Sequence, residues 1–197
     1  MGFALTGLKQ MSPISCLAVS GSLRQGSSNT SVLETAATLA PDGMTITIYK
    51  SIDELPHFNP DLDGARFQTV TAWLTSIRDA DGLIVSTPEY AHNIPGSFKN
   101  ALDWLVGSDA FIYKPFMILN TSPRSTYAHE SLVEILSTMS GVHVKTATMT
   151  IPLIGKSPRE ISVLIQEQYS GQIRTSLELF ARAIRDHPRE KDHLFAS

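Results

Sequence analysis

The stretch ISCLAVSGSLRQGSSN, residues 14–29, decides the fold of this chain. An apolar, partly β-branched run ends at Ser20, and a loop rich in glycine and serine follows it. From Asn29 onward the spacing of the apolar residues becomes helical. A buried strand, a short loop and a helix in that order form the first half of a parallel βαβ unit.

The same alternation recurs along the rest of the chain. Further runs of strand length and composition occupy residues 44–50, 82–88, 116–122 and 142–151. Helical periodicity occupies residues 29–39, 65–80, 95–106, 127–139 and about 158–184. We therefore expect a three-layer, doubly wound α/β fold whose five parallel strands take the order 2-1-3-4-5, with helices on both faces.

The composition indicates one globular domain, because 42% of the 197 residues are apolar and 18% are charged. We place the domain at residues 14–185, with a flexible leader at 1–13 and a C-terminal tail at 186–197. The net charge of −3, with Lys and Arg scattered along the chain, argues against nucleic-acid binding. Because no run of about twenty apolar residues occurs, we expect no membrane-spanning segment.

Cys16 is the single cysteine, and it lies inside an apolar run. One cysteine excludes an intramolecular disulfide, and a reducing, cytoplasmic location is the simplest interpretation. We interpret its side chain as a buried, unreactive thiol. The six histidines show no helical i, i+4 pair with a nearby carboxylate, so we expect no metal site.

In doubly wound sheets a ligand binds beyond the carboxyl ends of the strands, beside strand 1 where the strand order reverses. The loops after Ser20, Thr87 and Thr121 are therefore the candidates. The first combines glycines for a tight turn, successive backbone N–H groups, a helix N-terminus and a positive charge. These features predict an anion site formed by Ser22, Arg24, Ser27, Ser28 and Asn29.

The kind of anion follows from what this loop lacks. Gly21 and Gly26 have the spacing of a Walker A loop, yet Ser27-Ser28 stands where that loop has Lys followed by Ser or Thr. The middle glycine of a dinucleotide-binding fingerprint is also missing. A single phosphate group therefore suits the loop best. The alternative is a serine-rich turn in which Ser28 or Asn29 is a plain helix N-cap.

The second loop continues into a helix as TPEYAHNIPGSFKNALDW, residues 87–104. Asn93 stands where it would cap that helix, just ahead of Pro95. The segment resembles the PEY…PG…KNA(L/I)DW signature of the NADPH-dependent FMN reductase family, which includes quinone, azo and chromate reductases. The loop GSLRQGSSN resembles the same family at the same junction of strand and helix, and the likeness runs from about residue 14 to residue 184.

The resemblance implies a flavodoxin-like fold that binds FMN. By motif, the phosphate would be held by Ser22, Arg24, Ser28 and Asn29, with Ser27 beside them. The flavin ring would be lined by Pro88, Glu89, Tyr90, Ala91, His92 and Asn93. The loop after the fourth strand would contribute Ser122, Arg124 and Ser125.

Two positions depart from the family pattern. Ala91 stands where an Asn usually follows the Tyr, so that one hydrogen bond to the flavin would be missing. Arg124 stands in a stretch where the family often has Ser-Pro-Gly, and the neighbouring hydroxyls are those of Ser122 and Ser125.

The activity that the resemblance implies is hydride transfer from NADPH, through bound FMN, to a small acceptor such as a quinone, an azo compound or free flavin. The cofactor rather than a catalytic side chain would carry the chemistry. One alternative is a flavodoxin-type electron carrier that binds FMN but has no nicotinamide site. Another is a scaffold of the same fold that has lost the flavin.

We also expect a homodimer or homotetramer whose interface uses the helix at 95–106. The side chains of this helix that would face the sheet are Phe98, Leu102 and Leu105. Trp104 falls cleanly on neither stripe of this helix. It is interpreted as an interface anchor, because large aromatics are enriched at interface centres, with a core position between helix and sheet as the equal alternative.

Overall fold

The structure is a computed structural model and describes residues 12–187. A parallel sheet in the order β2-β1-β3-β4-β5, with β6 also paired to β4, confirms the predicted order. The strands are β1 (Ile14–Ser20), β2 (Met44–Tyr49), β3 (Gly82–Ser86), β4 (Pro115–Asn120), β5 (Val142–His143) and β6 (Met149–Thr150). The predicted leader and tail lie almost entirely outside the described residues.

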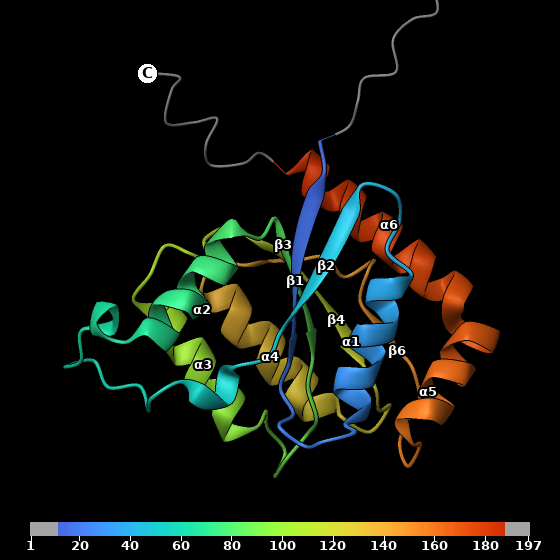
Figure 1. The fold of residues 1–197 in the computed structure, drawn as a ribbon, viewed down its shortest axis with the longest axis horizontal. Helices are drawn as coiled ribbons and strands as arrows, with labels where there is room; N and C mark the ends of the chain where they lie inside the picture. Colours follow the sequence, from blue (N-terminus) through green and yellow to red (C-terminus); the bar gives the residue numbers. More distant parts are fainter. Residues whose placement is uncertain (1–11, 188–197) are drawn as a thin grey trace, which may run out of the picture.

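Helices cover both faces of the sheet (Figure 1). One face carries α2 (Gln68–Asp79), α3 (Gly96–Val106) and α4 (Thr126–Thr138). The other carries α1 (Ser28–Thr38), α5 (Pro158–Leu164) and α6 (Ser170–Asp186). Two short 3₁₀ helices, η1 (Ile52–Glu54) and η2 (Gly64–Arg66), precede α2. Within residues 12–187, no helix combines the length and the apolar content needed to cross a membrane.

Each strand divides its side chains between two cores, because successive residues of a strand point to opposite faces. Leu17 and Val19 pack on the side of α2, α3 and α4, whereas Cys16 and Ala18 pack on the side of α1, α5 and α6. Since both faces are covered, the central strands are continuous apolar runs in the sequence. Burial raises the pKa of the Cys16 thiol, in agreement with an unreactive side chain.

The edge beyond β4 differs from the prediction of one strand over residues 142–151. The structure has two short strands, β5 and β6, with a turn between them. In this gap the backbone N–H of Ile118 in β4 donates to Oγ1 of Thr148 at 3.1 Å. The backbone N–H of Thr148 donates to the carbonyl oxygen of Val144, within the same turn, at 3.2 Å. The side chain of Thr148 therefore takes the place of a backbone carbonyl as the hydrogen-bond acceptor of β4. β propensity alone does not predict such a replacement.

The last helical segment, predicted at about 158–184, runs from Pro158 to Asp186 and contains one π-helical turn, η3 (Ile165–Tyr169). Its start has a clear local cause. The Ser157 hydroxyl accepts a hydrogen bond from the N–H of Glu160, and the Glu160 carboxylate accepts one from the N–H of Ser157. This reciprocal capping box satisfies two backbone donors that the helix itself cannot.

Helix α3 buries the predicted side chains Phe98, Leu102 and Leu105 against the sheet. Of the two positions expected for Trp104, at an interface or in the core between helix and sheet, the structure shows the core position. Trp104 is only 6% exposed, its Nε1 donates to the carbonyl oxygen of Pro56 at 2.8 Å, and its ring packs edge-on against Phe58. The segment before α2 in the same chain covers this tryptophan, so it belongs to the intramolecular core.

Candidate functional site

The first loop leaves β1 in close contact with the loop after β3. The N–H of Gly21 donates to the carbonyl oxygen of Ser86 at 2.8 Å, and a Cβ added at Gly21 would lie 2.2 Å from Oγ1 of Thr87. Only glycine fits there without a shift of the neighbouring chain. The Ser20 hydroxyl accepts a hydrogen bond from Thr30 of α1 at 2.9 Å. The ends of β1 and β3 and the start of α1 therefore form one packed edge.

The N-terminus of α1 presents unused backbone donors at this edge. Ser27 is the N-cap, since its Oγ accepts from the N–H of Asn29 at 3.2 Å, so neither Ser28 nor Asn29 has that role. Among the residues that the structure describes, no acceptor bonds the backbone N–H of Gly26, Ser28 or Thr30. With the positive end of the helix dipole, these donors suit a phosphate group.

Asn29 joins three elements of the fold. Its side chain is buried, and its Oδ1 accepts a hydrogen bond from Thr121 Oγ1 at 3.1 Å and lies 2.9 Å from Ser86 Oγ, whose single proton it shares with the carbonyl oxygen of Leu119. These hydroxyls stand at the end of β3 and just after β4, so Asn29 ties both to the start of α1. Because its oxygen is engaged within the protein, the side-chain amide nitrogen is the group that remains for a ligand.

The second loop forms a two-residue turn between Tyr90 and Asn93. The N–H of each donates to the carbonyl oxygen of the other, at 2.9 and 3.0 Å. Ala91 and His92 at the tip have φ angles of 49° and 59°, the left-handed conformation that residues with a Cβ rarely adopt. Ala91, which stands where an Asn usually follows the Tyr, is therefore more strained here than Asn would be, because Asn tolerates the left-handed region better than Ala.

Contacts with α4 hold this strained turn in place. Glu89 Oε2 accepts a hydrogen bond from the N–H of Ala128 at 3.0 Å, which places a carboxylate at the N-terminus of α4. Asn93 Oδ1 accepts from the Ser131 hydroxyl at 2.9 Å and from the N–H of Ile94 at 2.8 Å. The predicted cap on the third helix is therefore wrong, because the amide of Asn93 bonds elsewhere and the N-cap of α3 is Pro95.

The third loop is a compact turn that leads into α4. Ser122 Oγ accepts from the N–H of Arg124 at 3.1 Å, and its carbonyl oxygen accepts from the N–H of Ser125 at 3.2 Å. The Arg124 side chain is exposed, as is that of Arg24 in the first loop. Neither guanidinium forms an ion pair with any residue between 12 and 187. Two uncompensated positive charges therefore stand on loops at the same edge of the sheet.

Two aromatic rings join the second loop to the start of α4. The ring of His92 stacks on the ring of Tyr127, with centroids 4.3 Å apart and planes 19° apart. Sequence reasoning did not single out Tyr127, Ser131 or the Ser86–Thr121 pair. The signal that could have found them was their position, just after β4, at the end of β3 or in the first turns of α4.

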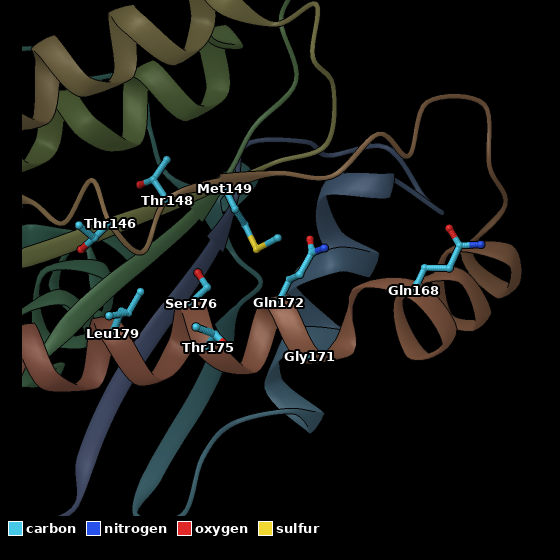
Figure 2. A pocket seen from close by; sticks show the side chains of 9 residues that line it. All are labelled: Thr146, Thr148, Met149, Gln168, Gly171, Gln172, Thr175, Ser176 and Leu179. Carbon is cyan, nitrogen blue, oxygen red and sulfur yellow. The ribbon is translucent and has the colours of Figure 1, made fainter.

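A separate groove of about 560 Å³ lies between α6 and the segment that leads into β6 (Figure 2). In the close-up, Gln172, Thr175, Ser176 and Leu179 project from α6, with Met149 opposite them. None of its lining residues is charged, so the groove does not suit an anion. Sequence analysis did not predict it.

A second hollow, of about 440 Å³, lies between α4 and the β5 edge and contains His129 and His143. The Nε2 of His143 lies 2.9 Å from Oγ1 of Thr148, and burial lowers the pKa of both histidines. In the described part of the chain, no three His, Cys, Asp or Glu side chains are grouped so as to hold a metal ion.

A doubly wound sheet whose β1, β3 and β4 loops meet at one donor-rich edge defines a flavodoxin-like protein. The sequence profile described as NADPH-dependent FMN reductase matches residues 14–155. The chain belongs to that family, as its two loop motifs predicted.

Individual relatives agree with this assignment. Over 106 residues the chain is 38% identical to a quinone reductase of Escherichia coli K12, a match that covers 52% of this chain and 56% of that protein. It is 39% identical over 112 residues to an NAD(P)H-dependent FMN reductase of Pseudomonas aeruginosa, which covers 55% of this chain and 60% of that one. The chain thus matches little more than half the length of these relatives.

Among solved structures, the flavoenzyme NAD(P)H:acceptor oxidoreductase FerB of Paracoccus denitrificans superimposes with a TM-score of 0.73. That match covers 88% of this chain and 98% of FerB, at 23% sequence identity. At this level of identity the likeness supports the fold.

Proposed function

We propose that this protein binds FMN at the shared edge of the β1, β3 and β4 loops and transfers reducing equivalents from NADPH to a small acceptor, such as a quinone, an azo compound or free flavin. The observation that carries the proposal is the set of unbonded N–H groups of Gly26, Ser28 and Thr30 at the start of α1. Such a set is a binding site for one phosphate group. The family to which the chain belongs is described as NADPH-dependent FMN reductase, which identifies the flavin as FMN and the nicotinamide as NADPH.

The phosphate of FMN would be held by the first loop. Arg24 would contribute charge, and the serine side chains and the amide nitrogen of Asn29 would contribute donors. The close approach of Gly21 to Thr87 brings the second loop directly beside this phosphate site. One ligand can therefore contact both loops, with its phosphate at α1 and its ring system toward α4.

The flavin ring would lie along residues 88–93 of the second loop. Bound FMN would supply the redox chemistry, accepting a hydride from the nicotinamide and passing electrons to the acceptor. The protein's own part is to bind and orient. Within the described residues, no acceptor bonds the backbone N–H of Glu89, Ala91 or His92, so these donors are free to fix the polar edge of the ring.

The first experiment is an absorbance spectrum of the protein reconstituted with FMN, followed by anaerobic addition of NADPH. A flavin spectrum that bleaches, together with continuous NADPH oxidation when a quinone is added, supports the proposal. A bound flavin that NADPH does not reduce favours the electron-carrier alternative. A protein that neither shifts the spectrum of FMN nor quenches its fluorescence contradicts FMN binding.

Arg24 gives the proposal a residue-level test. Replacing Arg24 with Ala should weaken FMN binding by roughly 1–3 kcal/mol, the scale of a hydrogen bond to a charged group. Arg182, exposed on α6 away from the loops, is the matched control, and its replacement by Ala should leave FMN affinity unchanged. Equal FMN affinity in both variants, measured by fluorescence titration at moderate salt, would show that Arg24 does not hold the phosphate.

We further propose that the working unit is a homodimer or homotetramer in the cytoplasm. The single, buried Cys16 suits a reducing compartment. The exposed side of α3 carries the Lys99–Asp103 ion pair and Val106, which is 64% exposed. An exposed apolar residue beside charged ones is compatible with a contact surface, although the buried Trp104 takes no part in it.

A further inference from the structure

The exposed tyrosines of this chain are not distributed evenly. Tyr90, Tyr113 and Tyr127 each expose more than half of their surface. Tyr90 and Tyr127 stand at the candidate site, on the second loop and in the first turn of α4. Tyr113 stands before β4, at the opposite end of the sheet. Clustered exposed aromatic surface beside a ligand loop marks a binding surface more often than isolated exposure does.

Tyr127 and His92 form an ordered shelf. Their rings are nearly parallel at 4.3 Å, and His92 sits there in a left-handed backbone conformation. Such a conformation persists only where surrounding contacts fix it. The hydrogen bonds that the N–H of Ala128 donates to Glu89 and the Ser131 hydroxyl donates to Asn93 provide these contacts. Contacts within the protein therefore hold the turn that carries His92, and the His92 ring stacks on the ring of Tyr127.

The shelf lies at the far end of the site from the phosphate loop. Helices α1 and α4 cover opposite faces of the sheet, so a ligand with its phosphate at α1 extends across the strand ends toward α4. A second molecule that approaches the ring from the α4 side meets Tyr127 and His92. Flat aromatic molecules stack on such rings, whereas small inorganic acceptors gain nothing from them.

We propose, resting on the proposed function, that the Tyr127–His92 shelf is the specificity-determining surface for flat aromatic acceptors. Tyr127 supplies the stacking surface, and His92 acts as a positioning residue that holds the Tyr127 ring. The shelf favours aromatic quinones and azo compounds over acceptors without an aromatic ring.

The test measures binding without turnover. The probe is 2-naphthol, a two-ring aromatic that the flavin does not reduce, titrated by calorimetry into the FMN-loaded protein. Tyr127→Ala should raise its Kd about 3- to 10-fold, the range expected for one lost aromatic stack. Tyr127→Phe keeps the ring and should stay within about twofold of the original protein. Tyr113→Ala removes an equally exposed tyrosine at the other end of the sheet and should have no effect.

A kinetic measurement then separates the two substrates. In the Tyr127→Ala variant, kcat/KM for the aromatic acceptor 1,4-naphthoquinone should fall. For ferricyanide, which has no aromatic ring, kcat/KM should be unchanged, and so should the rate of anaerobic flavin reduction by NADPH. An unchanged Kd for 2-naphthol, or an equal loss in Tyr113→Ala, overturns the inference. An equal slowing of flavin reduction by NADPH also overturns it, because the shelf would then serve the nicotinamide. Failure of the original protein to bind FMN would instead refute the proposed function.

Discussion

The turn at the tip of the second loop allows a test of whether the left-handed backbone conformation of Ala91 destabilises the protein. Ala91 has a φ of 49°, and its turn is closed by the reciprocal hydrogen bonds between Tyr90 and Asn93. A residue with a Cβ in this conformation costs about 1–2 kcal/mol relative to its usual one. Glycine has no such cost but loses about 0.4–1 kcal/mol more conformational entropy on folding than alanine does.

Replacing Ala91 with Gly should therefore stabilise the protein by about 0.5–1 kcal/mol. In a chain of this size that change raises the Tm by roughly 1–4 °C. Thermal unfolding of the FMN-free protein, followed by circular dichroism, is the direct measurement. Without the cofactor, a change in flavin binding does not contribute to the shift.

The matched control applies the same chemical change where the backbone is ordinary. Ala72 is exposed in the interior of α2, where Gly is destabilising by about 0.5–1 kcal/mol relative to Ala. The two Ala-to-Gly variants should thus shift the Tm in opposite directions. A Tm that falls in both would refute the left-handed conformation at position 91, and with it the account of the departure from the family's Asn.

Two further predictions concern the edge of the sheet and the assembly. Burial lowers the pKa of His129 and of His143 in the folded state below the value of about 6.5 expected in the unfolded state. Because the unfolded state therefore binds protons more readily, the contribution of the two histidines to stability is complete above about pH 6.5 and is lost as the pH falls. The free energy of unfolding, measured in urea between pH 7.5 and 5, should fall with the pH, and the double variant His129→Gln with His143→Gln should show a smaller fall. An equal fall in the original protein and in the double variant would contradict the assignment. Light scattering at micromolar concentration should give at least twice the 21.5 kDa of one chain, and Val106→Glu should reduce that mass, whereas an active protein of monomer mass would rule out the assembly.

The sequence by itself determined the layers of the fold and predicted the edge of the sheet at which the proposed site lies. Short, β-branched apolar runs indicate buried strands, and the amphipathic segments between them indicate helices that cover the two faces, so the parallel order and its ligand edge are predicted. The loop GSLRQGSSN predicts the proposed phosphate site from the sequence, because glycine, serine and a helix start are local properties. The burial of Phe98 and Leu102 follows in the same way from periodicity along one helix.

What only the tertiary structure decided are contacts between residues far apart in the sequence. The sequence does not encode locally that Trp104 is covered by Pro56 and Phe58, because a stripe of apolar residues does not specify what packs on it. Thr148 completes the ladder of β4, and His92 stacks on Tyr127, through chain reversals whose geometry depends on the whole sheet. Local propensity acts over a few residues, whereas these pairings are fixed by the packing of the complete fold.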